Sequence, residues 1–252
     1  MVKAIKITLL SFICICLVGF MITFIRSGFK FSNLKAKKIL DETYVVGNKK
    51  EISIEVRSSD IDFYTSDDEN IRVKIYADEK QKAKVSETED GLYIQNKRRS
   101  SCVGFCFTSN ERVEIYVPES YEGKFIIKAT SSDIESELTT LNSYKINVTS
   151  GDIELDNAKS LTGKTTSGDV EIGKLSSYIK FQTTSGDIDI EEFTVNKDSS
   201  IKVTSGDVTI DKCTNAYVDT KVTSGDVDVN KNDRHAEYEL KIKTTSGDVK
   251  VN

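Results

Sequence analysis

The residues of this chain best suited to chemistry are aspartates that recur at an almost constant spacing. Each follows a glycine in a Thr-Ser-Gly-Asp string. Two carboxylates can act together on a glycosidic bond, and a row of carboxylates can bind a cation. A catalytic pair is a local exception, whereas these aspartates recur in every copy, and the Gly- and Asp-rich nonapeptide of calcium-binding β-rolls is absent. We therefore interpret the strings as structural corners, with no metal and no cofactor: Gly151, Asp152, Gly168, Asp169, Gly186, Asp187, Gly206, Asp207, Gly225, Asp226, Gly247 and Asp248.

Other residue types with catalytic potential are scarce. His235 is the single histidine, and it adjoins the polar run 230–234, which is typical of an exposed loop. Cys102 and Cys106 form a lone C-x-x-x-C, a poor zinc signal without a second pair or a nearby histidine. In an extracellular domain these two cysteines could form a disulfide, and the sequence leaves this open against two free thiols. We assign no catalytic residues and expect that the protein is not an enzyme.

A repeat of short strands must position the strings. From Asp133, in the variant Thr-Ser-Ser-Asp, the aspartates lie 19, 17, 18, 20, 19 and 22 residues apart. β-Branched residues alternate on both sides of each string, as in half-buried strands. Val203 and Val208 are five residues apart, so on one straight strand they would face opposite sides. The chain must therefore turn a corner at Thr-Ser-Gly-Asp, where glycine permits a positive φ.

One such coil cannot bury its apolar side alone, so stacked coils must close a continuous core. This predicts an all-β fold, namely a single-stranded parallel β-helix or β-solenoid. We expect it to be right-handed, because crossovers between parallel strands are right-handed. The repeats occupy 120–252. Residues 49–119 show the same alternation less regularly, and we expect irregular first coils there, with strands at 52–56, 61–64, 71–75, 92–94 and 113–117.

The N-terminal segment has a different character. Residues 7–25 contain no charged side chain, and a helix of ~20 apolar residues spans a bilayer. No small-residue cleavage pattern follows. The sequence therefore predicts a signal-anchor transmembrane helix in 1–30, a juxtamembrane linker in 31–48 and the solenoid domain in 49–252. More basic residues follow the apolar run than precede it, so the positive-inside rule alone would leave the domain inside the cell.

Charge is unevenly distributed along the chain. Residues 1–30 carry four basic residues and no acid, so with −5 overall the remainder carries −9. A net acidic domain argues against nucleic acid as a partner, because neutralising phosphates requires a basic surface.

The repeats, T-S-G-D-[IV]-x-[IVL], and the preceding strand Val113-Glu-Ile-Tyr-Val-Pro118 resemble a bacterial family of β-strand-repeat domains of unknown function, known as putative adhesins. The resemblance covers about residues 50–252. It implies a β-solenoid, often tethered to the membrane in Gram-positive envelopes, with some members linked to envelope-stress responses. It implies no catalytic residues.

Together these observations predict a non-catalytic, membrane-anchored binding or scaffold protein of the cell surface, adhesin-like, with its domain outside the cell. The expected partners are the membrane and a protein or envelope-polymer ligand. The alternative is an enzyme that acts on envelope polysaccharide through the Asp carboxylates. The end at Val251-Asn252 would leave an open sheet edge, through which the C-terminal end of the solenoid could self-associate.

Overall fold

The computed structural model describes residues 36–77, 83–96, 111–230 and 232–252, and these form 19 strands. The strands before the repeats are β1 (Lys37–Val45), β2 (Glu51–Val56), β3 (Asp60–Ser66), β4 (Asn70–Ala77), β5 (Ala83–Glu87), β6 (Gly91–Asn96) and β7 (Arg112–Pro118). Those of the repeats are β8 (Lys124–Lys128), β9 (Ile134–Glu137), β10 (Ser143–Asn147), β11 (Ile153–Lys164), β12 (Val170–Ser185), β13 (Ile188–Thr194), β14 (Ser199–Ser205), β15 (Val208–Thr214), β16 (Ala216–Ser224), β17 (Val227–Val229), β18 (Tyr238–Ser246) and β19 (Val249–Val251).

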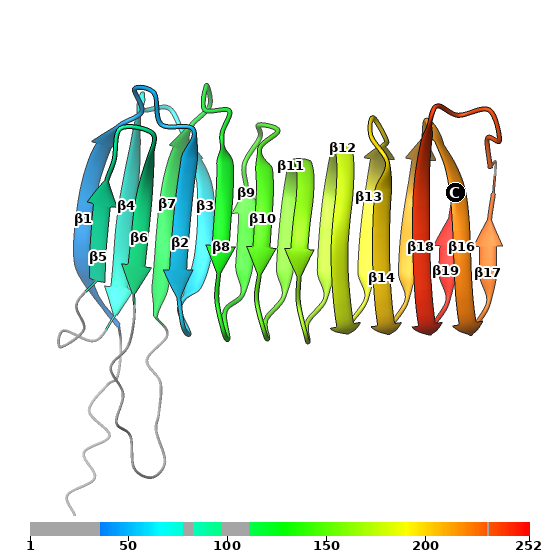
Figure 1. Ribbon diagram of the computed structural model, residues 1–252. Helices are drawn as coiled ribbons and strands as arrows, with labels where there is room; N and C mark the ends of the chain where they lie inside the picture. The colour runs from blue at the N-terminus through cyan, green and yellow to red at the C-terminus, as the bar shows by residue number, and fades with distance from the viewer. Residues whose placement is uncertain (1–35, 78–82, 97–110, 231) are drawn as a thin grey trace, which may run out of the picture. The chain divides into compact units, whose positions relative to one another are not determined.

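The strands form two layers that lie back to back (Figure 1). One layer pairs in the order β5, β6, β2, β8, β10, β11, β12, β14, β18, β16. The other pairs in the order β1, β4, β7, β3, β9, β11, β12, β13, β15, β19, β17. The long strands β11 and β12 contribute to both layers, because their two halves pair with different neighbours.

The fold class expected from the sequence needs correction. The described residues contain no helix, so a β-solenoid joined to a transmembrane helix is not what the structure shows. None of these residues lies in a helix suited to crossing a membrane. The apolar run at 7–25 lies outside the described residues.

The pairing is also not uniformly parallel. β1 and β4, β4 and β7, and β5 and β6 pair antiparallel at the N-terminal end of the stack, whereas the repeats pair parallel throughout. Residues 37–45, assigned to a linker from the sequence, form the edge strand β1. The five strands expected within 49–119 are present as β2, β3, β4, β6 and β7.

The order of the coils in space differs from their order in sequence at both ends. β18 and β19 lie between the coil of β14 and β15 and the coil of β16 and β17. β2 and β3 likewise lie between the coil of β6 and β7 and that of β8 and β9. The expectation that Val251-Asn252 forms the open edge is therefore wrong, because β16 and β17 are outermost.

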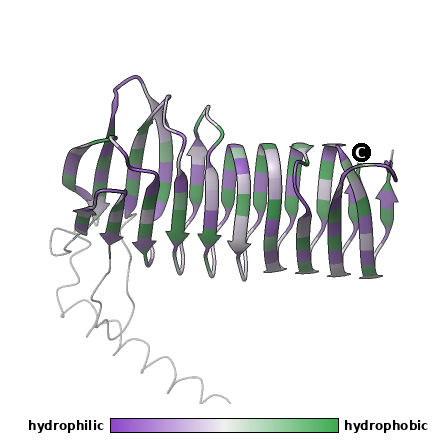
Figure 2. Ribbon diagram, turned by 45° about the horizontal axis from the view of Figure 1, so that its top comes forward, coloured by the Kyte–Doolittle hydropathy of each residue, from purple (hydrophilic) through white to green (hydrophobic). Residues whose placement is uncertain are grey.

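The core lies between the layers, and hydrophobic and hydrophilic bands alternate along the strands (Figure 2). Buried apolar residues from Ile52 to Val251 form one continuous cluster. Val203 and Val208 are 3% and 0% exposed and lie in opposite layers, so the corner inferred from their odd spacing is confirmed.

Asparagine side chains bridge coils at the edge of the stack opposite the Thr-Ser-Gly-Asp corners. The amides of Asn157, Asn196 and Asn215 donate to the carbonyls of Leu138, Ser176 and Val195 at 3.0, 2.8 and 2.8 Å. These bonds satisfy carbonyls where the chain passes between layers, and such buried backbone groups need partners.

Candidate binding surfaces

The corner aspartates form a hydrogen-bonded ladder along one edge of the stack. The Oδ1 atom of each carboxylate but the last accepts the backbone N–H of the equivalent aspartate in the next coil. The ladder begins at Asp60, whose Oδ1 lies 3.3 Å from the nitrogen of Asp133. It continues through Asp152, Asp169, Asp187, Asp207, Asp248 and Asp226, with distances of 2.7 to 3.0 Å. The aspartates therefore join adjacent coils.

The corner glycines are required by both backbone angle and space. Gly186 and Gly206 have φ values of 127° and 141°, as the odd spacing predicts. A Cβ atom on Gly206 would lie 2.2 Å from the carbonyl oxygen of Gly186. The glycines at 151, 168, 225 and 247 share the positive φ and the close approach to the neighbouring coil. The strings are thus corners in the structure, and their carboxylates are engaged in coil stacking.

The remaining chemistry-bearing residues lie apart or outside the described part. His235 is exposed between β17 and β18, where its backbone N–H donates to Oδ1 of Asp233 at 2.9 Å. Cys213 is half-buried with a free thiol, and burial raises its pKa to about 11, which keeps the thiol protonated. Cys102 and Cys106 lie outside the described residues. No group of three His, Cys, Asp or Glu side chains in the described ranges is placed to hold a metal ion.

The outer surface of the layer containing β3, β7, β9, β13 and β15 is acidic, and we call it the acidic face. Adjacent strands in register place one row of carboxylates side by side: Glu114, Asp62, Glu135, Glu154, Glu171 and Asp189. Neighbouring strands lie ~4.8 Å apart. Like charges at this separation repel one another, which is unfavourable for a sheet.

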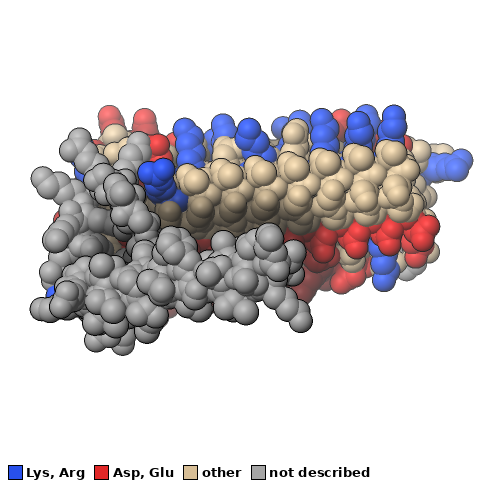
Figure 3. Space-filling view, turned by 90° about the horizontal axis from the view of Figure 1, so that it is seen from below, with Lys and Arg blue, Asp and Glu red and all other residues tan. Residues whose placement is uncertain are grey.

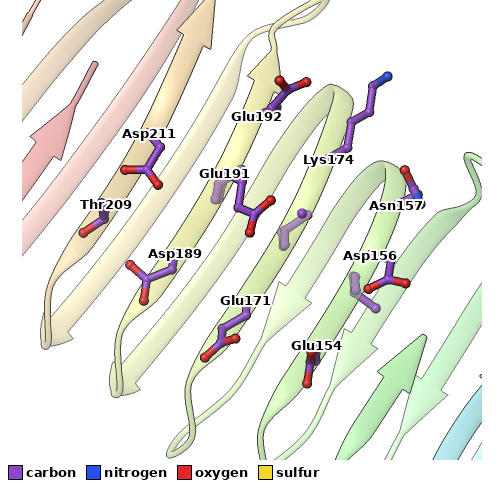
Figure 4. A pocket seen from close by; sticks show the side chains of 14 residues that line it. Glu154, Asp156, Asn157, Glu171, Lys174, Asp189, Glu191, Glu192, Thr209 and Asp211 are labelled. Atoms are coloured by element: carbon purple, nitrogen blue, oxygen red, sulfur yellow. The ribbon is translucent and has the colours of Figure 1, made fainter. Parts of the chain in front are cut away.

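A shallow hollow of ≈ 750 Å³ lies on the acidic face over β11, β12, β13 and β15. Figure 4 shows the side chains of Glu154, Glu171 and Asp189 on successive strands, followed by Thr209. Burial raises the pKa of Asp189, and the neighbouring aspartates raise it further. Lys212 pairs with Glu192 at 2.9 Å on the same face, so part of the negative charge is neutralised internally.

The outer surface of the opposite layer, from β8 to β16, is basic, and we call it the lysine face. One row along it contains, in register, Lys128, Asn147, Lys164, Gln182, Lys202, Lys243 and Lys221. A second row contains Lys145, Thr162, Lys180, Ser200, Lys241 and Asp219. All eight lysines are exposed, and Asp219 is the one carboxylate within the two rows.

The edge of the stack formed by the corners separates the lysine face from the acidic face. Figure 3 shows a band of uncharged residues along this edge, with lysines bordering it on one side and acidic residues on the other. The net charge concealed this pattern because it sums the basic and the acidic face into one number. The signal was nonetheless in the repeat, since a lysine two residues before Thr-Ser-Gly-Asp and an acid two residues after the Asp fall on different layers. Lys202-Val-Thr-Ser-Gly and Gly186-Asp-Ile-Asp189 are examples.

The fold and surfaces define a non-globular all-β stack with two oppositely charged faces. The chain belongs to the Toastrack DUF4097 family, whose profile matches residues 49–252. The family resemblance of the Thr-Ser-Gly-Asp repeats is thereby confirmed. No curated protein gives a significant match.

Solved structures similar to the chain come from several bacteria. A "putative adhesin" from Bacteroides fragilis is 13% identical, with 86% of this chain and 98% of that chain covered and a TM-score of 0.44. A "putative lipid binding protein" from Parabacteroides distasonis is 16% identical, with 84% and 96% covered and a TM-score of 0.45. A "putative cell adhesion protein" from Clostridium sporogenes is 12% identical, with 85% and 99% covered and a TM-score of 0.34.

Proposed function

We propose that this protein is a non-catalytic binding or scaffold module of the cell surface, adhesin-like in its mode of action. The observation that supports this proposal best is the pair of long charged faces, on which side chains of like charge recur along the stack. Such a surface can recognise an extended partner at many equivalent points. A small-molecule site would instead need a few convergent polar groups in an enclosed apolar pocket.

Catalysis is supported less well by the same residues. The corner carboxylates already accept backbone hydrogen bonds from the next coil. The carboxylates of the acidic face recur in register from strand to strand, so no pair is set apart from the rest. A general acid and a nucleophile or base in glycoside hydrolysis need different environments.

The alternative, an enzyme acting on envelope polysaccharide, rests on one feature. Asp189 has a raised pKa and lines the hollow on the acidic face, and a perturbed carboxyl in a concavity is a candidate acid. Incubation of the purified chain with isolated cell wall tests it. Release of reducing sugar that Asp189→Asn abolishes would establish the enzyme, whereas we expect no release from either protein.

The binding role itself is tested by sedimentation with isolated cell walls. We expect the purified chain to sediment with walls that have been washed free of membrane, and to be released by salt if the charged faces are used. A chain that stays in the supernatant at low salt would contradict the proposal.

We also propose that the domain faces outward from the cell. The eight exposed lysines of the lysine face make this measurable, because an impermeant amine reagent should label them on intact cells. Labelling that requires lysis would contradict an outward location. The link to envelope stress, which the family resemblance implies, stays a prediction that a transcript measurement after wall-damaging treatment would test.

A further inference from the structure

We infer that the lysine face binds a linear polyanion laid along the axis of the stack. This inference rests on the binding role proposed above and names the chemical class of the ligand. The two lysine rows run across the strands, and the strands stack along the axis, so each row is a straight track of positive charge.

Most charges on this track are not neutralised within the described part of the protein. Lys241 pairs with Glu239 at 2.7 Å. The other seven lysines of the face form no ion pair among the described residues. By contrast, Lys212 on the acidic face is paired, as is Lys49, with Glu87 at 2.7 Å. An unneutralised row of cations attracts an external anion at a rate and strength that fall with salt.

The spacing of the lysines suits a repeating anion. In the row nearest the corners, strands ~4.8 Å apart place Lys164 about 9.6 Å from Lys128 on one side and about 9.6 Å from Lys202 on the other. Lys202, Lys243 and Lys221 follow on adjacent strands. The row from Lys128 to Lys221 crosses six strand spacings, or about 29 Å. A single small anion would contact one or two of these lysines, whereas a polymer can contact all five.

Neutral hydrogen-bond donors accompany the charges. A hollow of ≈ 360 Å³ on this face is lined by Lys164, Lys202 and Lys243 together with Gln182. Exposed threonines of the corners complete its wall: Thr166, Thr184, Thr204 and Thr245. A hydroxyl beside an ammonium group provides two donors to one anionic oxygen, and donation to an ionised acceptor gives the stronger kind of hydrogen bond.

The residue types favour a polymer without bases. The rows contain lysine and no arginine, and lysine acts as a point charge without a fixed bidentate geometry. Single-stranded nucleic acid binding also uses aromatic rings on which bases stack. The two outward-facing tyrosines between β8 and β16 lie outside both rows. The ammonium group of Lys197 covers the ring of Tyr178 at 4.7 Å, and Tyr217 lies on the outermost coil.

The test compares two variants with the same change of charge. The triple variant Lys164→Gln, Lys202→Gln, Lys243→Gln removes charge from the lysine face. The control Lys174→Gln, Lys212→Gln, Lys250→Gln removes three exposed lysines from the acidic face. Thermal melts first check that both full-length variants fold. Binding is measured against two baseless probes, inorganic polyphosphate and polyglutamate, and against a single-stranded oligonucleotide of equal charge.

We expect the wild-type chain to bind at least one baseless probe. The lysine-face variant should lose about tenfold or more in affinity, with the slope of log K against log salt reduced by about two to three. The control should bind as tightly as the wild type or more tightly. The probe that binds better distinguishes a phosphate polymer from a carboxylate polymer. Equal affinity of the two variants, absence of binding to both baseless probes, or tighter binding of the oligonucleotide would each overturn the inference.

Isolated cell walls separate this inference from the broader proposal. If the wild type sediments with walls and the lysine-face variant does not, both stand. If both proteins sediment equally, the domain binds walls through another surface, and the polyanion inference alone fails. If neither sediments, the binding role fails as well.

Discussion

The two ends of the stack close their sheets over the apolar core in different ways. The repeats use one local device, a glycine corner and an aspartate ladder, coil after coil. The first strands use long-range pairing instead, in which β1 pairs antiparallel with β4, and β4 with β7. At the corner before β3, Ser59 replaces the glycine. It is fully buried and bonds Glu111 and Asn96 at 3.3 and 2.9 Å.

This contrast shows that a sequence repeat predicts the structure only where the residues that determine it lie close together in the chain. It also raises the question of whether the two regions unfold together.

The largest expected effect is at the junction of the two regions. Phe125 is fully buried, with ring centroids 4.5 Å from Phe63 and 5.2 Å from Tyr144. Phe125→Ala should reduce the free energy of unfolding by ~3–5 kcal/mol through a cavity. Ile201→Val in the repeats should cost only ~0.5–1.5 kcal/mol. Denaturant melts measure both. A biphasic melt of Phe125→Ala, with one phase unchanged, would show that the regions are independent.

The next effect compares glycines. Gly206→Ala places a methyl group against the backbone of the neighbouring coil at a φ of 141°, and we expect a cost of ~2–4 kcal/mol. Gly47 also has a positive φ, 47°, but a Cβ there would meet nothing within 4 Å. Gly47→Ala should therefore cost about 1 kcal/mol or less. Equal costs would mean that backbone angle, and not stacking, makes the corner glycines necessary.

The first region should make the stability of the protein depend on pH. Burial raises the pKa of Asp62 to about 6, with Glu135, Asp60 and Glu114 adding to the effect against Arg112. The folded state therefore binds more protons than the unfolded state between pH 4 and 6, so Asp62 makes stability fall as pH rises through that range. Asp62→Asn should remove this fall.

Relative to wild type, the free energy of unfolding of Asp62→Asn should be higher by roughly 1–2 kcal/mol more at pH 7 than at pH 4, after allowance for solvent screening. Unfolding is measured at both pH values. An identical pH profile in wild type and variant would contradict the assignment.

The smallest effect concerns single rungs of the ladder. Asp187→Ala deletes the acceptor of the Asp207 N–H and should cost ~0.5–1.5 kcal/mol. Asp226 ends the ladder, and no described N–H donates to its carboxylate, so Asp226→Ala should have almost no effect. Asp187→Asn keeps the Oδ1 acceptor, so its loss of stability should lie between those of Asp187→Ala and Asp226→Ala. Equal losses at Asp187 and Asp226 would show that the aspartates act within their own corner.

Local rules explain what the sequence predicted. The odd spacing of Val203 and Val208 predicted the corner, and alternation predicted the strands of the repeats and five strands of the first region. The sequence did not reveal the pairing of 37–45 with 70–77, because antiparallel partners far apart in a chain share no local motif. It did not reveal that the aspartate hydrogen bonds join neighbouring coils, because a single coil contains no information about its neighbour. The charged faces do not show in the net charge, because consecutive strands of the chain belong to opposite layers.

The inserted coil has a consequence for how the protein is made. Residues 216–229 leave the ribosome before 238–251, yet their strands pair only with β18 and β19. Until then the emerging coil could dock on β14 and β15, since its Thr-Ser-Gly-Asp corner matches as well as the correct one. Side-chain size distinguishes the two outcomes: Leu240 and Ile242 fill the interior at 0% and 1% exposure, whereas the smaller Val218 and Thr220 occupy the matching positions of the end coil. Synthesis in chain order thus offers a trap that later residues must displace, and slow rearrangement at this end would set the rate at which the newly made chain becomes native.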